Sequence, residues 1–274
     1  MRYKNKVFVI TGASGGIGAA LARQIAGRRH KLVLASRGAE RLERIAAECR
    51  ALGAHAIAVP TDVAVDTDCR QLIERAIEAF GGIDVLINGA GASSHARFDA
   101  VADFASYERL WRVNCLGAIQ CTRHAYPHLR AAPGKRGGQV VGISSLAGKV
   151  GVPGGTAFCA SRFAQSGFFE ALRTEAEDDG IAVTVAYPAA VKVGSRRAVP
   201  HGLGDDTAMT ADQCARLIMR AIRARKRELV TGRTGRIRLW LKLIAPRWIE
   251  RMARAGVEKN TEEIDDRTRF PAEP

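Results

Sequence analysis

The chain has 274 residues, of which 47% are hydrophobic, and its 42 Lys and Arg residues against 28 Asp and Glu residues give a formal net charge of +14. This length fits one large α/β domain or two small ones, and the basic balance suits a phosphate-bearing ligand, an anionic membrane surface or nucleic acid. No apolar run reaches the roughly 18 residues of a spanning helix, and residues 1–6 show no signal-peptide pattern, so we expect a cytoplasmic protein, with peripheral membrane contact left open.

The cysteines are scattered over segments that we expect to be helices, or over the edges of those segments. None has the spacing of a zinc site, so no metal is expected. Small buried thiols in the reduced state fit this distribution better. The six residues are Cys49, Cys69, Cys115, Cys121, Cys159 and Cys214.

Strand-like and helix-like patterns alternate along the chain, and the strand-like runs are mostly apolar. The expected strands are Val7–Thr11, Lys31–Ser36, Ala54–Pro60, Ile83–Asn88, Gln139–Ser144, Ile181–Tyr187 and Glu228–Val230. The expected helices run from about Ile17 to Ile25, over Glu40–Leu52, through Leu72–Phe80, from about Asp103 to Leu129, and over Ala157–Glu177 and Ala211–Arg225. Such units predict one Rossmann-type, doubly wound α/β domain, with a parallel sheet of about seven strands and helices on both faces.

The domain is expected to span residues 1–232 and to include a long loop at 188–210 that is rich in Gly, Pro and charge. Loops of this length in compact domains are usually functional or disordered. Residues 233–256 are expected to form a basic, amphipathic helical extension, and residues 257–274 a polar tail.

The first strand ends in the glycine cluster Gly12-Ala-Ser-Gly-Gly16-Ile17-Gly18, and a helical pattern follows. A tight loop before a helix leaves backbone N–H groups free at a positive helix end, where a pyrophosphate can bind. Glycines are needed there because a Cβ would block close approach of phosphate and helix. The spacing differs from G-x-G-x-x-G, and a plain turn is the alternative.

Several motifs occur in a fixed order between residue 7 and about residue 190. They are Thr11-Gly12-x-x-x-Gly16-Ile17-Gly18, Asp62-Val63, Asn88-Gly89-Ala90-Gly91, Asn114 and Ser144-Ser145. Together they resemble the short-chain dehydrogenase/reductase family. Residues 151–172 and the basic C-terminal segment are similar to the 11β-hydroxysteroid dehydrogenase-like branch of that family.

The resemblance implies a seven-stranded parallel sheet that binds NAD(P) at its carboxyl edge. By position, the pyrophosphate and ribose would meet Gly12, Ser14, Gly16, Ile17 and Gly18. Asp62 and Val63 would meet the adenine, and the central part of the cofactor would meet Asn88, Ala90 and Gly91, a segment that could also be a simple turn. Pro188 and Val191, after the sixth strand, complete the expected cofactor contacts.

The end of the second strand favours NADP(H) over NAD(H). An NAD-preferring site needs a carboxylate there for the ribose hydroxyls, but this strand ends in Ser36-Arg37 and no acid precedes Glu40. A hydroxyl and a guanidinium suit a 2′-phosphate. Arg37 could instead be a solvated charge at the start of a helix.

The family's chemistry uses an Asn, a Ser, a Tyr thirteen residues after the Ser as the general acid/base, and a Lys four residues further on. The Lys binds the nicotinamide ribose and lowers the pKa of the Tyr, and the Ser orients the substrate oxygen. Asn114 and Ser145 match, but Phe158 stands at the Tyr position and Arg162 at the Lys position. Phe has no proton to give, and losing a positioned general acid costs about 10²–10⁴-fold in rate.

Arg162 keeps a positive charge and could still bind ribose hydroxyls, although a planar guanidinium differs from a compact ammonium. Ser144, Cys159, His95 or a water near Asn114 are the conceivable replacement proton donors. The loop after the sixth strand also departs from the family, with Ala189 in place of Gly and Val193 in place of Thr.

Residues 233–254 interleave cations with large apolar residues. If Arg236–Ala245 and Pro246–Ala255 are helices, their apolar anchors lie between basic faces: Trp240, Leu241, Ile244, Trp248, Ile249 and Met252. This pattern is typical of a helix in an anionic interface. Amphipathic helices also cover substrate clefts and subunit contacts, so both interpretations are open.

These observations favour an NADP(H)-dependent oxidoreductase of a carbonyl or secondary alcohol, with a bulky or lipid-like substrate left open, whose activity is impaired or altered. The alternative is an NADP(H)-binding relative without turnover, natural or engineered, that acts through regulation or a partner. No nucleic-acid recognition motif accompanies the positive charge. The family resemblance implies a homodimer or homotetramer through the helices at Asp103–Leu129 and Ala157–Glu177.

Overall fold

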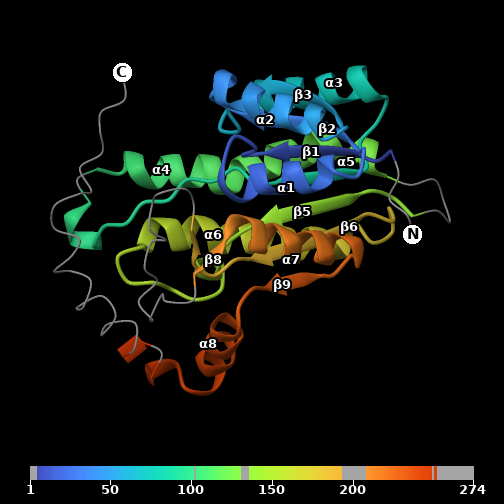
Figure 1. Cartoon of the computed structure of the whole chain (residues 1–274). Helices are drawn as coiled ribbons and strands as arrows, with labels where there is room; N and C mark the ends of the chain where they lie inside the picture. The colour runs from blue at the N-terminus through green and yellow to red at the C-terminus, as the bar shows by residue number, and fades with distance from the viewer. Residues whose placement is uncertain (1–4, 102, 131–135, 193–207, 249, 252–274) are drawn as a thin grey trace.

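The computed structural model describes residues 5–101, 103–130, 136–192, 208–248 and 250–251. Its main sheet contains the strands β1 (Val7–Thr11), β2 (Lys31–Ser36), β3 (His55–Pro60), β4 (Val85–Asn88), β5 (Gln139–Ile143), β6 (Ala182–Tyr187) and β9 (Glu228–Val230). The strand order is β3-β2-β1-β4-β5-β6-β9, and every neighbouring pair is parallel. The predicted parallel sheet of about seven strands is therefore confirmed (Figure 1).

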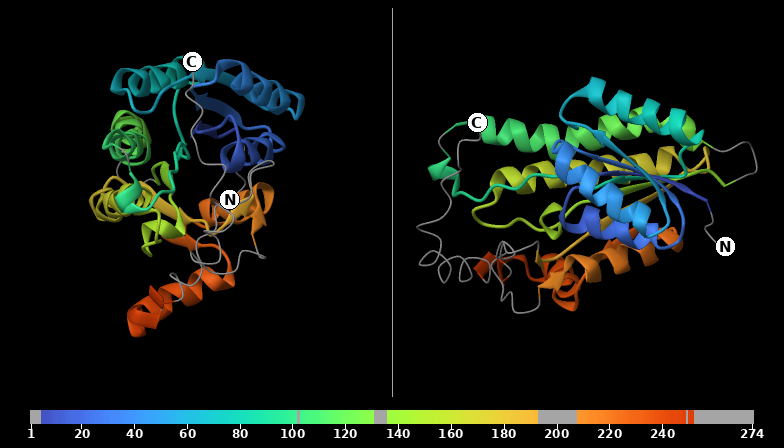
Figure 2. Two further views of the ribbon diagram at one scale, coloured as in Figure 1. Left: turned by 90° about the vertical axis from the view of Figure 1, so that its left-hand side faces the viewer. Right: turned by 45° about the horizontal axis from the view of Figure 1, so that its top comes forward.

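The main helices are α1 (Gly16–Ala26), α2 (Ala39–Ala51), α3 (Asp66–Phe80), α4 (Ala105–Trp111), α5 (Gly117–Leu129), α6 (Thr156–Glu175), α7 (Ala211–Arg223) and α8 (Arg233–Ile244). Helices α1, α2 and α7 pack on one face of the sheet, and α3, α5 and α6 pack on the other. The end-on view of Figure 2 shows these two helical layers on either side of the strands. Helix α8 projects from the edge that carries β9 (Figure 1).

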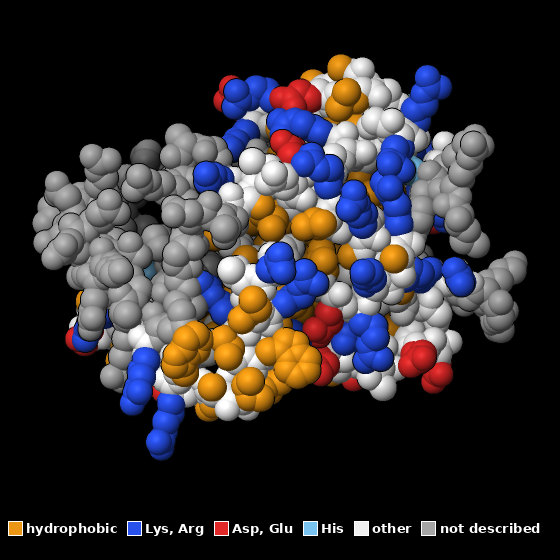
Figure 3. Space-filling model, turned by 60° about the horizontal axis from the view of Figure 1, so that its bottom comes forward, with side chains coloured by type: hydrophobic (Ala, Val, Ile, Leu, Met, Phe, Trp, Pro, Cys, Tyr) orange, Lys and Arg blue, Asp and Glu red, His pale blue; other side chains and the backbone are white. Residues whose placement is uncertain are grey.

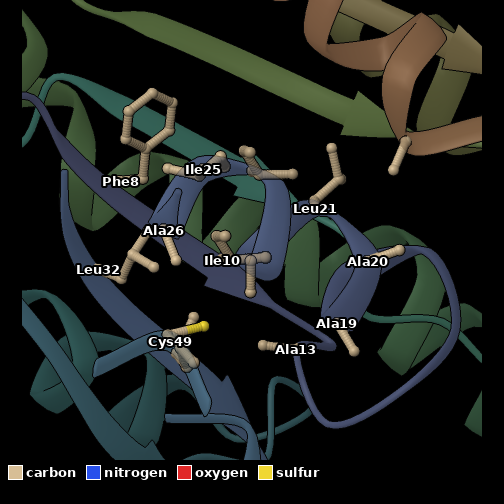
Figure 4. Packing of buried hydrophobic residues seen from close by; sticks show 14 of the residues in the cluster. Phe8, Ile10, Ala13, Ala19, Ala20, Leu21, Ile25, Ala26, Leu32 and Cys49 are labelled. Carbon is tan, nitrogen blue, oxygen red and sulfur yellow. The ribbon is translucent and has the colours of Figure 1, made fainter. Parts of the chain in front are cut away.

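The apolar strands are explained by burial on both faces. Side chains alternate along a strand, so Phe8 and Ile10 of β1 join the core under α1, while Val9 between them joins the core under α3 and α5. All five residues of β1 are buried. Figure 4 shows Phe8 and Ile10 packed against Leu21 and Ile25 of α1, so burial of this strand fixes the start of the glycine loop that follows it.

The prediction of a single long helix over Asp103–Leu129 is wrong in detail. The observed helical segment begins at Ala105, and Arg112–Leu116 between α4 and α5 is a π-helical turn, which inserts one residue into the helical repeat. Pro127 lies inside the last turns of α5. In the extension, α8 runs from Arg233 to Ile244 and residues 246–248 are helical; the predicted tail at 257–274 lies outside the described residues.

A short two-stranded parallel sheet joins β7 (Val191–Lys192) to β8 (Met209–Thr210). It flanks residues 193–207, the part of the predicted long loop that lies outside the described residues. Within the described part of the chain, no helix has the length and apolar character needed to cross a membrane.

Candidate active site

The glycine loop between β1 and α1 is shaped for an anion. Gly12 has a φ of 69°, and a Cβ on Gly18 would lie 2.2 Å from the carbonyl oxygen of Gly12, so a side chain is sterically excluded at both positions. Gly15 caps α1 without a side-chain hydrogen bond, and the first turn of the helix contains no acid. The positive end of α1 is thus open to an anionic ligand such as a pyrophosphate.

The loop after β4 lies directly against the glycine loop. The Oγ1 of Thr11 accepts hydrogen bonds from the backbone N–H groups of Gly89 and Ala90, both at 3.1 Å. A Cβ on Gly12 would lie 2.6 Å from the carbonyl oxygen of Gly89. The two segments that the sequence predicts as cofactor-binding therefore meet at one carboxyl edge of the sheet.

Asn88, at the end of β4, is buried and only partly satisfied. Its Nδ2 donates to Thr122 Oγ1 of α5 at 3.0 Å, while its Oδ1 has no hydrogen-bond partner. A buried acceptor without a partner is destabilising unless a ligand or water fills the position. Gly91, three residues on, is exposed at the same loop.

The end of β2 offers a second polar atom without a partner. The Oγ of Ser36 is buried and unpaired, and Arg37 beside it is exposed. Arg41, in the first turn of α2, reaches back to the glycine loop, because a Cβ on Gly15 would lie 2.7 Å from its Nη2. Nothing in the sequence pattern singles out Arg41, since this contact joins residues 26 positions apart. These groups together can hold a phosphate.

Asp62 and Val63 follow β3, and both have structural partners. Asp62 Oδ1 accepts from the backbone N–H of Ala64 at 2.9 Å, and Val63 is buried against Gly117 at the start of α5. The backbone N–H of Asp62 donates to Asp68 Oδ2 at 2.9 Å. These bonds hold the turn in place and leave Asp62 half-buried at the edge of the sheet.

Asn114 lies in the π-helical turn and connects three segments. Its Nδ2 donates to Ala92 O and to Ser161 Oγ, both at 2.9 Å, and its Oδ1 accepts from Ala92 N at 2.8 Å. The residue is completely buried. Asn114 therefore fixes the loop after β4 against α6, the helix that carries Phe158 and Arg162.

Ser145 follows β5 and caps the short 3₁₀ turn Leu146–Gly148. Its Oγ accepts from the backbone N–H of Ala147 at 3.2 Å, which leaves the hydroxyl proton free for another acceptor. Lys149 follows this turn, forms an ion pair with Glu228, and lies 4.6 Å from the centroid of the Tyr187 ring. Sequence reasoning did not identify these three supporting residues, which come from three separate elements.

Arg162 is a buried cation with neutral neighbours. Its Nη1 donates to Ile143 O at 3.1 Å and to Gln165 Oε1 at 3.0 Å, and its Nε has no partner. Burial lowers the pKa of its guanidinium to about 10, which leaves it charged at neutral pH. No ion pair to Arg162 is found in the described part of the chain.

The guanidinium of Arg162 faces the loop after β4 and the ring of Phe158. A Cβ on Gly91 would lie 2.2 Å from Arg162 Nη2 and 3.3 Å from Asn114 Oδ1, and the Arg162 guanidinium carbon lies 5.3 Å from the Phe158 ring centroid. The structure thus brings Asn114, Phe158, Arg162 and Gly91 together. The donors that Arg162 does not use fit a ligand with hydroxyl groups.

The candidate replacement donors differ in their surroundings. Ser144 Oγ is buried 3.4 Å from Ser166 Oγ, and the buried Cys159 thiol, whose pKa is raised by burial, accepts from Val152 N at 3.3 Å. His95 is half-buried beside Gly154, and the backbone N–H of the next residue, Ala96, donates to Gly154 O at 2.8 Å. Burial lowers the pKa of His95, so its neutral form is favoured.

The segment after β6, where Ala189 stands at the family's Gly position, is held by hydrogen bonds to two neighbouring segments. Pro188 O accepts from Leu146 N at 2.9 Å, and Ala189 N donates to Thr231 Oγ1 at 2.9 Å. Ala189 is not among the described residues with positive φ, so this turn does not require glycine. Val191 lies half-buried in β7, whereas Val193 lies outside the described residues.

A parallel sheet with two glycine-lined loops at its carboxyl edge defines a dinucleotide-binding fold. The short chain dehydrogenase family model matches residues 6–203. The chain therefore belongs to the short-chain dehydrogenase/reductase family. Within the described residues, no group of three or more His, Cys, Asp or Glu side chains is placed to hold a metal ion.

The relatives include proteins of the 11β-hydroxysteroid dehydrogenase-like branch, which supports the expected placement. The chain is 31% identical over 253 residues to 11-beta-hydroxysteroid dehydrogenase-like 4A of Arabidopsis thaliana, covering 89% of this chain and 82% of the relative. It is 32% identical over 262 residues to the dehydrogenase/reductase SDR family protein 7-like of Dictyostelium discoideum, covering 90% and 80%.

Solved structures share the fold. A dehydrogenase/reductase from Sinorhizobium meliloti superposes with a TM-score of 0.75 at 25% identity, covering 83% of this chain and 93% of that one. An alcohol dehydrogenase from Thermococcus sibiricus, solved with 5-hydroxy-NADP, superposes with a TM-score of 0.73 at 24% identity, covering 83% and 96%.

Proposed function

We propose that the chain is an NADP(H)-dependent oxidoreductase of a carbonyl or secondary alcohol, in which proton transfer to the substrate oxygen is impaired. The observation that carries the proposal is the group of Ser36, Arg37 and Arg41 beside the glycine loop: a buried unpaired hydroxyl and two guanidinium groups, with no carboxylate at the end of β2. This set favours a 2′-phosphate over free ribose hydroxyls.

The cofactor, when bound, supplies or accepts the hydride. The chain would hold it through the N-terminus of α1, the loop Asn88–Gly91 and the unused donors of Arg162. Ser145 retains a hydroxyl proton with which to bond the substrate oxygen. Phe158 offers no proton, so the oxygen must be protonated by another group or by water, and the chemical step is expected to be slow.

The decisive experiment compares the chain with the double variant Phe158→Tyr/Arg162→Lys. NADPH binding to both proteins is first measured by fluorescence titration, and NADPH oxidation is then followed with a panel of ketones and aldehydes. We expect both to bind NADPH and the double variant to turn over about 10²–10⁴-fold faster. Equal rates would show that another group delivers the proton. Failure of the unaltered chain to bind NADPH would overturn the proposal.

The preference for NADP(H) over NAD(H) is tested by substituting the residues expected to bind the 2′-phosphate. Arg41→Ala and Arg37→Asp are each expected to weaken NADPH about tenfold or more, because each removes a charge-assisted contact, and to leave NADH nearly unchanged. Arg44→Ala, an exposed position one residue before Ile45 of α2, is the matched control. Unchanged NADPH affinity in both variants would contradict the preference for NADP(H).

A second function, cofactor binding without turnover, is favoured because Arg162 is buried against Phe158 with no acidic side chain among the described residues to pair with it. The chain would then bind NADP(H) without turnover and act through a partner or by regulation. The same panel separates the two, because this function predicts NADPH binding with no oxidation by any substrate. Recovery of activity in the double variant would show that a working scaffold has been silenced at these two positions.

We also propose that the protein is located in the cytoplasm. All six cysteines are free and buried, and the Cys121 thiol donates a hydrogen bond to Cys69 Sγ at 3.4 Å, with no disulfide between the two. Unlinked thiols at this distance fit a reducing compartment. Subcellular fractionation of the full chain would test the location.

A further inference from the structure

Helix α8 and the turn after it expose a large apolar surface. Four of its side chains recur at helical spacing on α8 and the fifth lies in the turn after it, and the whole set is defined here as the α8 patch: Ile237 (55% exposed), Trp240 (70%), Leu243 (77%), Ile244 (73%) and Trp248 (49%). Figure 3 shows hydrophobic side chains gathered on the face that carries α8, with Lys and Arg side chains around them. Apolar surfaces of this kind mark contact sites for proteins or membranes.

Cations dominate the same segment. Between residues 233 and 251 there are six Lys and Arg residues and one acid, Glu250: the cations are Arg233, Arg236, Arg238, Lys242, Arg247 and Arg251. A second copy of the chain placed on the α8 patch would bring two such basic segments together, which like-charge repulsion opposes. An anionic surface is complementary to them.

The extension is fixed to the body of the protein. Lys242 Nζ donates to Lys149 O at 2.6 Å and lies 5.1 Å from the Phe163 ring centroid. A Cβ on Gly235 would lie 3.3 Å from Val230 Cγ1 and 3.7 Å from Leu146 Cδ2, so α8 packs closely on the turn that follows Ser145. Whatever binds the α8 patch is therefore held next to the candidate active site.

We propose that the α8 patch docks the protein onto the surface of an anionic lipid bilayer. Trp240, Leu243 and Ile244 enter the boundary between headgroups and acyl chains, and the Arg side chains of the same segment bind lipid phosphates. Tryptophan is favoured at this boundary because its ring is apolar and its N–H is polar. The proposal does not depend on turnover, so failure of the proposed reaction leaves it intact.

The test is flotation of the full chain with vesicles of phosphatidylcholine alone or mixed with phosphatidylserine, at low and high salt. We expect binding to the mixed vesicles at low salt, with weaker binding at high salt or without phosphatidylserine. Trp240→Ser/Leu243→Ser keeps every charge and is expected to reduce binding at least about tenfold, since it removes two large side chains that the bilayer would bury. Phe98→Ser/Leu52→Ser, which removes two exposed apolar side chains outside α8, is the matched control.

Three outcomes would overturn the proposal. The first is no lipid-bound fraction with phosphatidylserine at low salt. The second is undiminished binding of Trp240→Ser/Leu243→Ser, which would assign the attraction to the overall charge of +14. The third is an unaltered chain that sediments as a dimer and does not bind vesicles, together with a double variant that sediments as a monomer. That result would make the α8 patch a subunit contact.

Discussion

Gly12 is required at its position for two independent reasons. Its φ of 69° is strained for any residue with a side chain, and a Cβ there would lie 2.6 Å from Gly89 O and 2.8 Å from Ala90 Cα. Both neighbours are backbone atoms, which cannot rotate away. The glycine therefore sets the distance between the two loops that we assign to the cofactor.

We expect Gly12→Ala to lower the free energy of unfolding by about 1–3 kcal/mol and to weaken NADPH binding, because strain and a backbone clash are introduced together. Urea unfolding and NADPH titration measure the two effects. Gly38→Ala is the control, because Gly38 has a φ of −76° and nothing lies within 4 Å of its Cβ position. Equal stabilities of the two variants would show that the loops can separate without loss.

His30 is a buried imidazole that folding keeps neutral. It is 1% exposed, its ring centroid lies 5.2 Å from that of Phe8, and its Nδ1 accepts from Lys6 N at 3.3 Å. Burial, followed by the charge of Arg28, lowers the pKa of His30 below its ordinary value of 6.5. The unfolded chain therefore binds a proton that the folded chain excludes, and stability is lost as the pH falls below about 6.5.

We expect the unaltered chain to lose more stability between about pH 7.5 and pH 5.5 than His30→Asn does. The difference is at most about 1.4 kcal/mol, the linkage limit for one proton one pH unit below the free-histidine pKa. Urea midpoints at the two pH values provide the measurement, and exposed His55→Asn is the control. Parallel losses in all three proteins would assign the pH dependence to other groups.

At the scale of elements, α7 has the most complete N-terminus among the described helices for which a cap is given. Thr210 Oγ1 accepts from Gln213 N at 3.2 Å, and Gln213 Oε1 accepts from Thr210 N at 2.9 Å, so two backbone donors are satisfied reciprocally. Helix α7 packs against α1 in the same hydrophobic core. This cap therefore supports the layer that holds the glycine loop.

We expect Thr210→Ala to lower the free energy of unfolding by about 1 kcal/mol, the usual effect of removing a side-chain cap. Thr210→Ser keeps the hydroxyl and should recover most of the loss. Thermal unfolding followed by circular dichroism measures both variants. A Thr210→Ser variant as unstable as Thr210→Ala would show that the methyl group, rather than the cap, supports this end of α7.

The strands of the main sheet were predictable to within one or two residues because most are buried, mainly apolar runs that end at glycine, proline or a polar residue, whereas β7 and β8 lie in the segment that was expected to be a loop. The helices were less predictable. No residue type in the sequence marks the π-helical turn at Arg112–Leu116, and its effect is visible only in the structure, where Asn114 is buried. A one-residue insertion in a helix leaves the hydrophobic spacing nearly intact. Periodicity therefore predicted helix here but not its geometry.

At the scale of the molecule, the sequence predicted which segments meet at the carboxyl edge of the sheet but not the contacts that join them. Motif order placed the glycine loop, Asn88, Asn114 and Ser145, because each follows a strand or lies in a helix that ends at the same edge. The Arg41 contact, the unpaired Ser36 Oγ and the ion pair of Lys149 with Glu228 join distant segments. No spacing rule reports such contacts before the fold is known.

The outer surface of α4, α5 and α6 is the candidate contact between copies of the chain. We propose a homodimer or homotetramer through α4, α5 and α6, where Trp111 is 43% exposed and Phe163 is 40% exposed. Aromatic residues are the usual anchors of such interfaces. A stable interface must bury about 1,200–2,000 Å² in total, which requires whole helices rather than single side chains.

We expect sedimentation of the full chain to show a dimer or tetramer that Trp111→Glu shifts toward monomer, because a carboxylate buried in an interface without a partner costs several kcal/mol. Trp240→Glu, on α8, places the same charge on the α8 patch and should leave the oligomer intact while weakening lipid binding. Circular dichroism confirms that both variants are folded. A chain that is monomeric at every concentration, or an oligomer that only Trp240→Glu dissociates, would contradict assembly through α4 to α6.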